Sequence, residues 1–196
     1  MKVQSIKKID LEKYQVIIDD KEYIFNEDTL VKLKITSNKD IGQEVITKLL
    51  LEEMIVDAYK KALNYHLRYA KSSKECFIYL KSKDISLNII EEAIARLVAN
   101  KIINDETLAI NIASSYARNS NGPLLIKHKL KQHQFSEDII RKALENIEQS
   151  DYDLGLNKLL IKANKKFAKL EEKNKIIKIK NFIYQRGYTE YKELHE

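Results

Sequence analysis

The sequence predicts a mainly α-helical protein, in which tandem three-helix repeats form an elongated, curved array behind a small N-terminal β-hairpin module. Three observations predict this fold class. Only four Gly and one Pro occur in 196 residues, too few for the turns of a β-sandwich or barrel. From Asp40 onward, apolar residues recur at spacings of three and four. Similar segments also return after about 50 residues, the behaviour of a helical repeat protein.

The N-terminal part of the chain predicts the β-hairpin module. Two runs rich in β-branched and aromatic residues, 14–18 and 23–25, are separated by the turn-forming pair Asp19-Asp20, which is typical of a hairpin. Because an isolated hairpin is only marginally stable in water, we expect a third strand at about 4–9 or packing on a helix. A short helix at 26–33, capped by its first residue, should follow.

The rest of the chain is predicted to be helical, because the segments that interrupt the apolar periodicity are short and polar. The predicted helices are 41–53, 55–70, 73–82, 86–99, 105–119, 123–133, 136–149, 151–170 and 173–186. A short last helix should begin at Thr189.

Internal repetition organises these helices. Two segments align without a gap at a spacing of 50 residues, and the matched positions are Leu80, Ile85, Ser86 and Ala93 with Leu130, Phe135, Ser136 and Ala143. Upstream, at a spacing of 51, the matched positions are Ala58, Ala62 and Tyr65 with Ala109, Ala113 and Tyr116. A weaker third copy contains Gly187. Chance agreement between amphipathic helices is the alternative, and the shared order of elements argues against it.

These patterns divide the chain into five parts. The hairpin module takes residues 1–38 and a connecting helix takes 39–56. Three-helix repeats follow at 57–104, 105–150 and 151–196. Because such repeats cannot each bury an apolar face alone, neighbours stack and leave large surfaces for a long partner.

Composition limits the classes of function. The net charge is +6, from 35 Lys and Arg against 29 Asp and Glu, so the position of the basic residues decides what they bind. Cys76 is the single cysteine, which excludes an internal disulfide and favours a small core residue. No segment approaches the roughly 20 apolar residues of a membrane span, and no signal peptide is recognisable. We expect a soluble cytoplasmic protein without membrane contact.

The order and spacing of several short segments resemble the RecX family of recombination regulators over most of the chain. The segments are 58–63 with Arg68, Ser72 and Glu75; Asp105 with Ala109; Gly122 with Ile126 and Leu130; Arg186-Gly187-Tyr188; and 27–32. Two departures stand out. Asp84 and Gln134 occupy positions where the family usually has Gly, of which only Gly187 is kept, and a Leu that is usual near Cys76 is missing. Asp and, less well, Gln can end a helix at such a left-handed position.

The resemblance implies a noncatalytic regulator in homologous recombination, DNA repair and the SOS response. It would dock along the helical groove of a RecA filament on single-stranded DNA, contact neighbouring protomers, and inhibit or modulate ATP hydrolysis, strand exchange and filament growth. RecA would carry the ATP, since this chain has no Gly-rich phosphate loop and needs no cofactor. We expect a monomer whose partners are the RecA filament and single-stranded DNA, with double-stranded DNA left open.

The clearest candidate surface is one side of the predicted helix 151–170. At about 100° per residue, five lysines fall within one arc: Lys158, Lys162, Lys165, Lys166 and Lys169. The residues expected on the opposite, packing side are Leu156, Leu160, Ala163, Phe167 and Leu170. Lys173 and Arg186 continue the positive charge, which favours a polyanionic partner. A solvated face without a ligand is the alternative.

Two further basic clusters are candidates. Arg118, Lys127 and Lys131 surround the predicted turn at 119–123. In the first repeat, Arg68 stands among alternating cations and aromatics, a composition that suits base stacking or a protein groove.

Other readings are weaker. No Ser, His and Asp form a recognisable catalytic motif, the carboxylates of Glu52-Glu53 follow an ordinary surface pattern, and His128 and His133 have the wrong spacing for a metal pair. We therefore expect neither an enzyme nor a metal site. A helix-turn-helix transcription regulator is one alternative, although its reading helix would lack the usual basic opening. A helical-repeat scaffold that binds protein alone is another.

Overall fold

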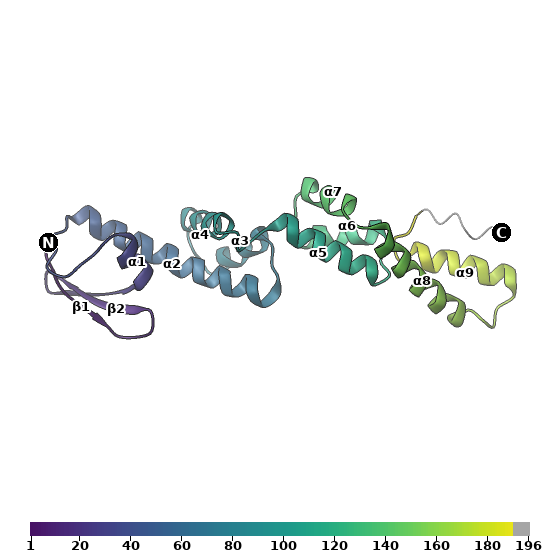
Figure 1. Cartoon of the computed structure of the whole chain (residues 1–196), viewed down its shortest axis with the longest axis horizontal. Coiled ribbons are helices and arrows are strands. Elements are labelled where there is room, and N and C mark those ends of the chain that lie inside the picture. Colours follow the sequence, from purple (N-terminus) through teal and green to yellow (C-terminus); the bar gives the residue numbers. More distant parts are fainter. Residues whose placement is uncertain (190–196) are drawn as a thin grey trace. The chain divides into compact units, whose positions relative to one another are not determined.

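The computed structural model describes residues 1–189 and has a small sheet followed by helices (Figure 1). The strands are β1 (Val3–Lys8), β2 (Lys13–Ile18) and β3 (Lys21–Asn26). The helices are α1 (Glu27–Lys32), α2 (Gln43–Tyr69), α3 (Ser73–Lys81), α4 (Leu87–Ala99), α5 (Asp105–Arg118), α6 (Pro123–Gln132), α7 (Glu137–Glu145), α8 (Gln149–Lys166) and α9 (Glu172–Tyr184). The predicted mainly helical fold with an N-terminal hairpin is confirmed. The helix expected from Thr189 falls on 190–196, outside the described residues.

The sheet is antiparallel, with the strand order β1-β2-β3. In the hairpin, Tyr14 of β2 lies opposite Phe25 of β3. Asp19 and Asp20 have φ values of 44° and 63°, the positive values that a tight two-residue turn requires. The third strand expected near residues 4–9 is β1, which pairs with β2.

Helix α2 differs from the prediction, because one continuous helix replaces the two predicted at 41–53 and 55–70. Met54, at the predicted break, lies in a run of Glu, Met and Ile that contains neither Gly nor Pro. Such residues are compatible with an uninterrupted helix, so the separation was wrong. The helix passes through the predicted part boundary at residue 56.

The chain forms two compact units, Met1–Ile103 (unit 1) and the residues from Asn104 onward (unit 2). Unit 1 has two apolar cores, and α2 contributes residues to both. The first lies between the sheet, α1 and the start of α2 and includes Val3, Val16, Phe25, Leu30, Ile46 and Leu49. The second lies between the end of α2, α3 and α4 and includes Ala58, Ala62, Cys76, Leu80, Ile90 and Leu97. Cys76 is therefore a small core residue, as expected.

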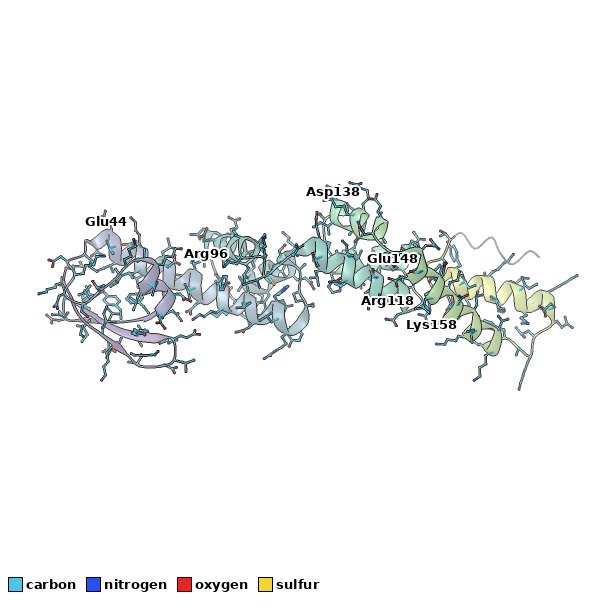
Figure 2. All side chains as sticks on the ribbon, in the orientation of Figure 1. Glu44, Arg96, Arg118, Asp138, Glu148 and Lys158 are labelled. Atoms are coloured by element: carbon cyan, nitrogen blue, oxygen red, sulfur yellow. The ribbon has the colours of Figure 1, made fainter. Side chains whose placement is uncertain are left out.

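Charged side chains join the sheet region to the helices of unit 1. Glu52 on α2 is only 7% exposed and accepts from Arg96 of α4 (Nη1 to Oε1, 2.5 Å; labelled in Figure 2) and from Lys32 of α1 (Nζ to Oε2, 2.9 Å). Glu53 accepts hydrogen bonds from the buried Asn26 backbone N–H at 2.8 Å and the Thr29 hydroxyl at 2.7 Å. The expectation that Glu52-Glu53 is an ordinary surface pattern was wrong.

Unit 2 repeats the helical packing of unit 1. Its first core lies between α5, α6 and α7 and contains Ala109, Ala113, Ile126, Leu130, Ile140 and Ala143. Four of the pairs predicted from the sequence spacing are buried: Leu80 with Leu130, Ala93 with Ala143, Ala58 with Ala109, and Ala62 with Ala113. Ser86 and Ser136 are exposed, and Tyr65 and Tyr116 are half-buried. A second core between α8 and α9 contains Leu159, Ala163, Ile179 and Ile183.

The three turns after α3, α6 and α9 share one backbone conformation. Asp84, Gln134 and Gly187 have φ values of 58°, 61° and 84°, in the left-handed region that favours glycine. These are the three positions where the RecX resemblance expects Gly. Asp84 and Gln134 therefore keep the left-handed φ of the turn without being glycine.

None of the helices within residues 1–189 has the length and apolar character needed to cross a bilayer.

Candidate nucleic-acid interface

Four lysines of the predicted basic arc project from α8. Lys158, Lys162, Lys165 and Lys166 are exposed, and we call them the α8 basic face. Lys169 is also exposed, but α8 ends at Lys166, so Lys169 lies in the connection to α9. Between Lys158 and Arg186 the sequence holds ten basic residues and two acidic ones, Glu171 and Glu172. The surface is therefore strongly cationic.

The packing side of α8 is rotated relative to the prediction. Its buried residues are Gly155, Leu159 and Ala163, of which only Ala163 was assigned to the core. Leu170, which was expected to pack, is 41% exposed because it follows the end of the helix. Leu156, Leu160 and Phe167 border the core and are partly buried. The basic face therefore flanks the buried stripe.

A glycine sets the close approach of α8 to α5. A Cβ on Gly155 would lie 2.0 Å from the Ala117 carbonyl oxygen, a distance that no side chain tolerates. The absence of a side chain lets the α8 backbone lie against the end of α5. The sequence signal for this contact was a glycine inside a helical pattern, and its role was not recognised.

This approach brings Arg118 to the start of the α8 basic face. The Lys158 ammonium donates a hydrogen bond to the Arg118 carbonyl oxygen at 3.3 Å, and both residues are labelled in Figure 2. The Arg118 guanidinium lies 3.5 Å from Asp151 and is 52% exposed. Two candidates from different predicted repeats thus meet on one surface of unit 2.

Phe182 of α9 organises the other end of the surface. The Lys166 ammonium lies 5.0 Å from the centre of its ring, and the Arg186 guanidinium lies 6.0 Å from it. Cations at these distances are attracted by the negative face of an aromatic ring. Phe182 therefore holds Lys166 and Arg186 near each other, and the sequence analysis did not identify it.

The turn that carries Arg186 is attached to α6 through backbone groups. Gly122 N–H donates to the Arg186 carbonyl at 2.6 Å, and Leu124 N–H donates to the Gly187 carbonyl at 3.3 Å. A Cβ on Gly122 would lie 2.4 Å from the Gly187 carbonyl carbon. These bonds satisfy amides at the start of α6 that have no partner within the helix. They also fix the backbone at Arg186.

The remaining candidates belong to other segments of the chain or are partly neutralised. Lys131 and Lys127 both pair with Glu137, at 2.6 and 3.7 Å. The hydrogen bond from Lys131 is the main cause that lowers the pKa of the Glu137 carboxyl. Lys173 is exposed near the start of α9, and Arg68 belongs to α2 in unit 1. Among residues 1–189, no group of three or more His, Cys, Asp and Glu side chains could hold a metal ion.

No family model matches the chain. Comparison with known proteins nevertheless finds relatives that share one name. Regulatory protein RecX of Streptococcus pneumoniae (strain Hungary19A-6) is 32% identical over 182 residues, covering 89% of this chain and 69% of the relative. Regulatory protein RecX of Bacillus subtilis (strain 168) is 27% identical over 188 residues, covering 94% of this chain and 71% of the relative.

A crystal structure of regulatory protein RecX has a similar fold. It superposes with a TM-score of 0.80 over 96% of this chain and 94% of that chain, at 18% sequence identity. At that identity the likeness establishes the fold alone.

Proposed function

The chain belongs to the RecX family, and from this membership we propose that it is a noncatalytic regulator of RecA that binds RecA filaments on single-stranded DNA and inhibits their activity. The structural observation that supports the binding part of the proposal is the cationic surface of unit 2, built from the α8 basic face, Arg118 and Arg186. A filament on DNA offers phosphates and acidic side chains, which are suitable partners for such a surface.

The arrangement of these cations leaves them free to contact a partner from the solvent. The α8 basic face is exposed, while the core contacts of the helix are made by Gly155, Leu159 and Ala163. Within residues 1–189, the four lysines of that face form no ion pair with a carboxylate, so their charges are available to a ligand. Each phosphate neutralised releases counterions, and binding should weaken steeply as salt rises.

The protein would inhibit RecA by occupying binding sites along the filament. A protein seated on several protomers at once raises the cost of their movement during ATP hydrolysis and strand exchange, and blocks addition of protomers where it covers a filament end. The proposed binding residues are Lys158, Lys162, Lys165, Lys166, Lys169, Lys173, Arg186 and Arg118, with Lys127, Lys131 and Arg68 as secondary contacts. The three-helix parts at 57–104, 105–150 and 151–196 would be the docking units.

The test is RecA-dependent ATP hydrolysis on single-stranded DNA while the protein is titrated in. One variant changes Lys158, Lys162, Lys165, Lys166 and Lys169 to Glu. The matched control changes five exposed lysines of unit 1 to Glu: Lys7, Lys13, Lys21, Lys34 and Lys48.

We expect inhibition by the wild type and the control, and a loss of at least about tenfold in potency for the variant, since several phosphate contacts are removed. Equal inhibition by all three proteins would discard the α8 basic face and keep RecA regulation. No effect of the wild type on hydrolysis or strand exchange would overturn the proposed function.

A further inference from the structure

A second surface with ligand-binding character lies in unit 1, where α2 ends and α3 passes beside it. A pocket of about 800 Å³ is lined there by Lys61, Asn64, Tyr65, Leu67, Arg68, Tyr69 and Tyr79. Its size falls in the range of roughly 300–1,000 Å³ that small-molecule sites occupy. The lining contains three tyrosines and two cations but no carboxylate.

The tyrosines form an ordered aromatic group. Tyr65 and Tyr79 stack with ring centres 4.2 Å apart and an angle of 12°, and Tyr69 meets the Tyr65 ring edge-on at 5.5 Å. Tyr65 and Tyr79 are partly buried, whereas Tyr69 is 54% exposed. The stacked pair is a fixed wall, and Tyr69 is the ring whose surface is open to a ligand.

Cations surround this group. Arg68 lies 5.9 Å from the centre of the Tyr69 ring, Lys71 lies 5.9 Å from that of Tyr65, and Lys83 lies 5.6 Å from that of Tyr79. Lys71 also pairs with Glu75 at 2.7 Å, which offsets its charge. Arg68 and Lys61 form no ion pair within residues 1–189, so positive charge remains at the pocket.

We propose that this pocket binds an unpaired base of single-stranded nucleic acid, with the base stacked on Tyr69 and the flanking phosphates paired with Arg68 and Lys61. Exposed aromatic rings interleaved with cations are the arrangement that binds single strands without regard to sequence. In a duplex the bases are already stacked on one another, so duplex DNA offers the pocket only phosphates. A basic peptide would find no carboxylate in this lining to pair with its cationic side chains.

The inference deepens the proposed function, because it names what unit 1 contributes to a partner that contains single-stranded DNA. The pocket differs from the α8 basic face in the part of the nucleic acid that it recognises. Lysines on α8 respond to phosphate charge, whereas Tyr69 responds to the presence of a base. A ligand that keeps the phosphates and loses the bases therefore separates the two surfaces.

The experiment measures binding of the full chain to fluorescein-labelled 20-nucleotide strands by anisotropy, without recombinase. The strands are oligo(dT) and an abasic chain of the same length and charge. The variants are Tyr69→Ala, Tyr69→Phe and, as a matched control, Tyr184→Ala, which removes an aromatic side chain that is 65% exposed on α9. Circular dichroism checks that each variant keeps the helical fold.

We expect the wild type to bind oligo(dT) at least about fivefold more tightly than the abasic chain, in line with the contribution of one stacked base. Tyr69→Ala should remove that difference, while Tyr69→Phe and Tyr184→Ala should retain it. Equal affinity of the wild type for both strands would overturn the inference, as would an unchanged preference in Tyr69→Ala. Neither result decides the RecA hydrolysis assay, because that assay measures the effect of the whole protein on RecA and its variant leaves Tyr69 and Arg68 unchanged.

Discussion

The two units hold their parts together in different ways. In unit 1, two carboxylates of α2 reinforce the apolar packing, with Glu52 bound to Arg96 of α4 and Lys32 of α1, and Glu53 bound to Asn26 at the end of β3. In unit 2, α8 and the turn after α9 are attached by backbone contacts at three glycines, Gly122, Gly155 and Gly187. The first kind of junction depends on charge, and the second depends on the absence of a side chain.

The difference bears on where ligands bind. Unit 1 uses Arg96 and Lys32 internally, so those cations are already paired. In unit 2, α8 lies against α5 through its backbone at Gly155, and the exposed lysines of the α8 basic face form no ion pair with a carboxylate within residues 1–189. A glycine junction therefore keeps a cationic surface available, at the cost of tolerating almost no substitution at the glycine.

The largest effect is expected at the glycine junction. Gly155→Ala should destabilise unit 2 by about 3 kcal/mol, because the new methyl group would overlap the Ala117 carbonyl oxygen. Alanine in an open helix position would instead stabilise by up to about 1 kcal/mol. Urea denaturation followed by circular dichroism measures the change.

Gly42→Ala is the matched control, since the nearest atom to its Cβ would be the flexible Glu44 side chain at 3.6 Å. Its cost should stay below about 1 kcal/mol, the loss of a favoured N-cap residue. Similar losses for both variants would show that the close approach of α8 to α5 does not control stability.

The carboxylate junction should give a smaller effect that depends on pH. Burial acts to raise the pKa of Glu52, but hydrogen bonds from Arg96 and Lys32 outweigh it and hold the pKa below the ordinary 4.5. A lowered pKa adds stability that is complete above pH 4.5 and is lost as the pH falls through the folded-state pKa. Glu52→Gln should therefore cost about 1–2 kcal/mol at pH 7.

The cost of Glu52→Gln should shrink toward zero in acid, as wild-type Glu52 itself becomes protonated. Denaturation curves at several pH values between 3 and 7, in steps of about one unit, measure this convergence. Glu92→Gln is the control, because Glu92 pairs with the same Arg96 but is 48% exposed. Glu92→Gln should lower the free energy of unfolding by no more than about 0.5 kcal/mol. A cost for Glu52→Gln that is the same at every pH would contradict the charged junction.

The smallest effect is a gain in stability at the repeated turns. Gln134 has a φ of 61°, where a side chain is strained and glycine is not. Gln134→Gly should stabilise by about 0.5–1 kcal/mol, and Asp84→Gly should gain less because Asp tolerates this region better. Gln185→Gly, at a helical φ of −61°, should destabilise instead. Thermal melting of the three variants tests the order.

Local signals predicted much of the fold. Paired aspartates identified the hairpin turn, and the spacing of Leu80 and Leu130 identified equivalent core positions. Ser136, one of the matched repeat positions, caps α7 by accepting a hydrogen bond from the Ile139 backbone N–H. The hairpin turn and the cap each depend on residues within one turn, and each core position depends on the periodicity of its own helix, where the sequence pattern and the physical cause coincide.

The failures involve contacts between distant segments. Glu52 looks like a surface residue until α4 brings Arg96 to it, 44 positions away. Leu159 is buried because α9 packs on that side of α8, and no periodicity within α8 alone reveals that rotation. The basic arc was recognised from the helical spacing of its lysines, but its neighbours Arg118 and Phe182 came from other helices. Which of these cations contact a ligand stays a prediction.

The continuous α2 carries a constraint on length. Ile46 and Leu49 face the sheet, while Ala58 and Ala62 face α3 and α4, so one helix fixes the angle between two buried stripes. Each residue inserted between Leu49 and Ala58 would turn one stripe by about 100° and shift it by about 1.5 Å. Only insertions close to a whole number of helical turns, such as seven residues, would restore the directions in which the two buried stripes face. Length variation among relatives in this helix should therefore occur in steps set by the helical pitch, while neighbouring loops vary freely.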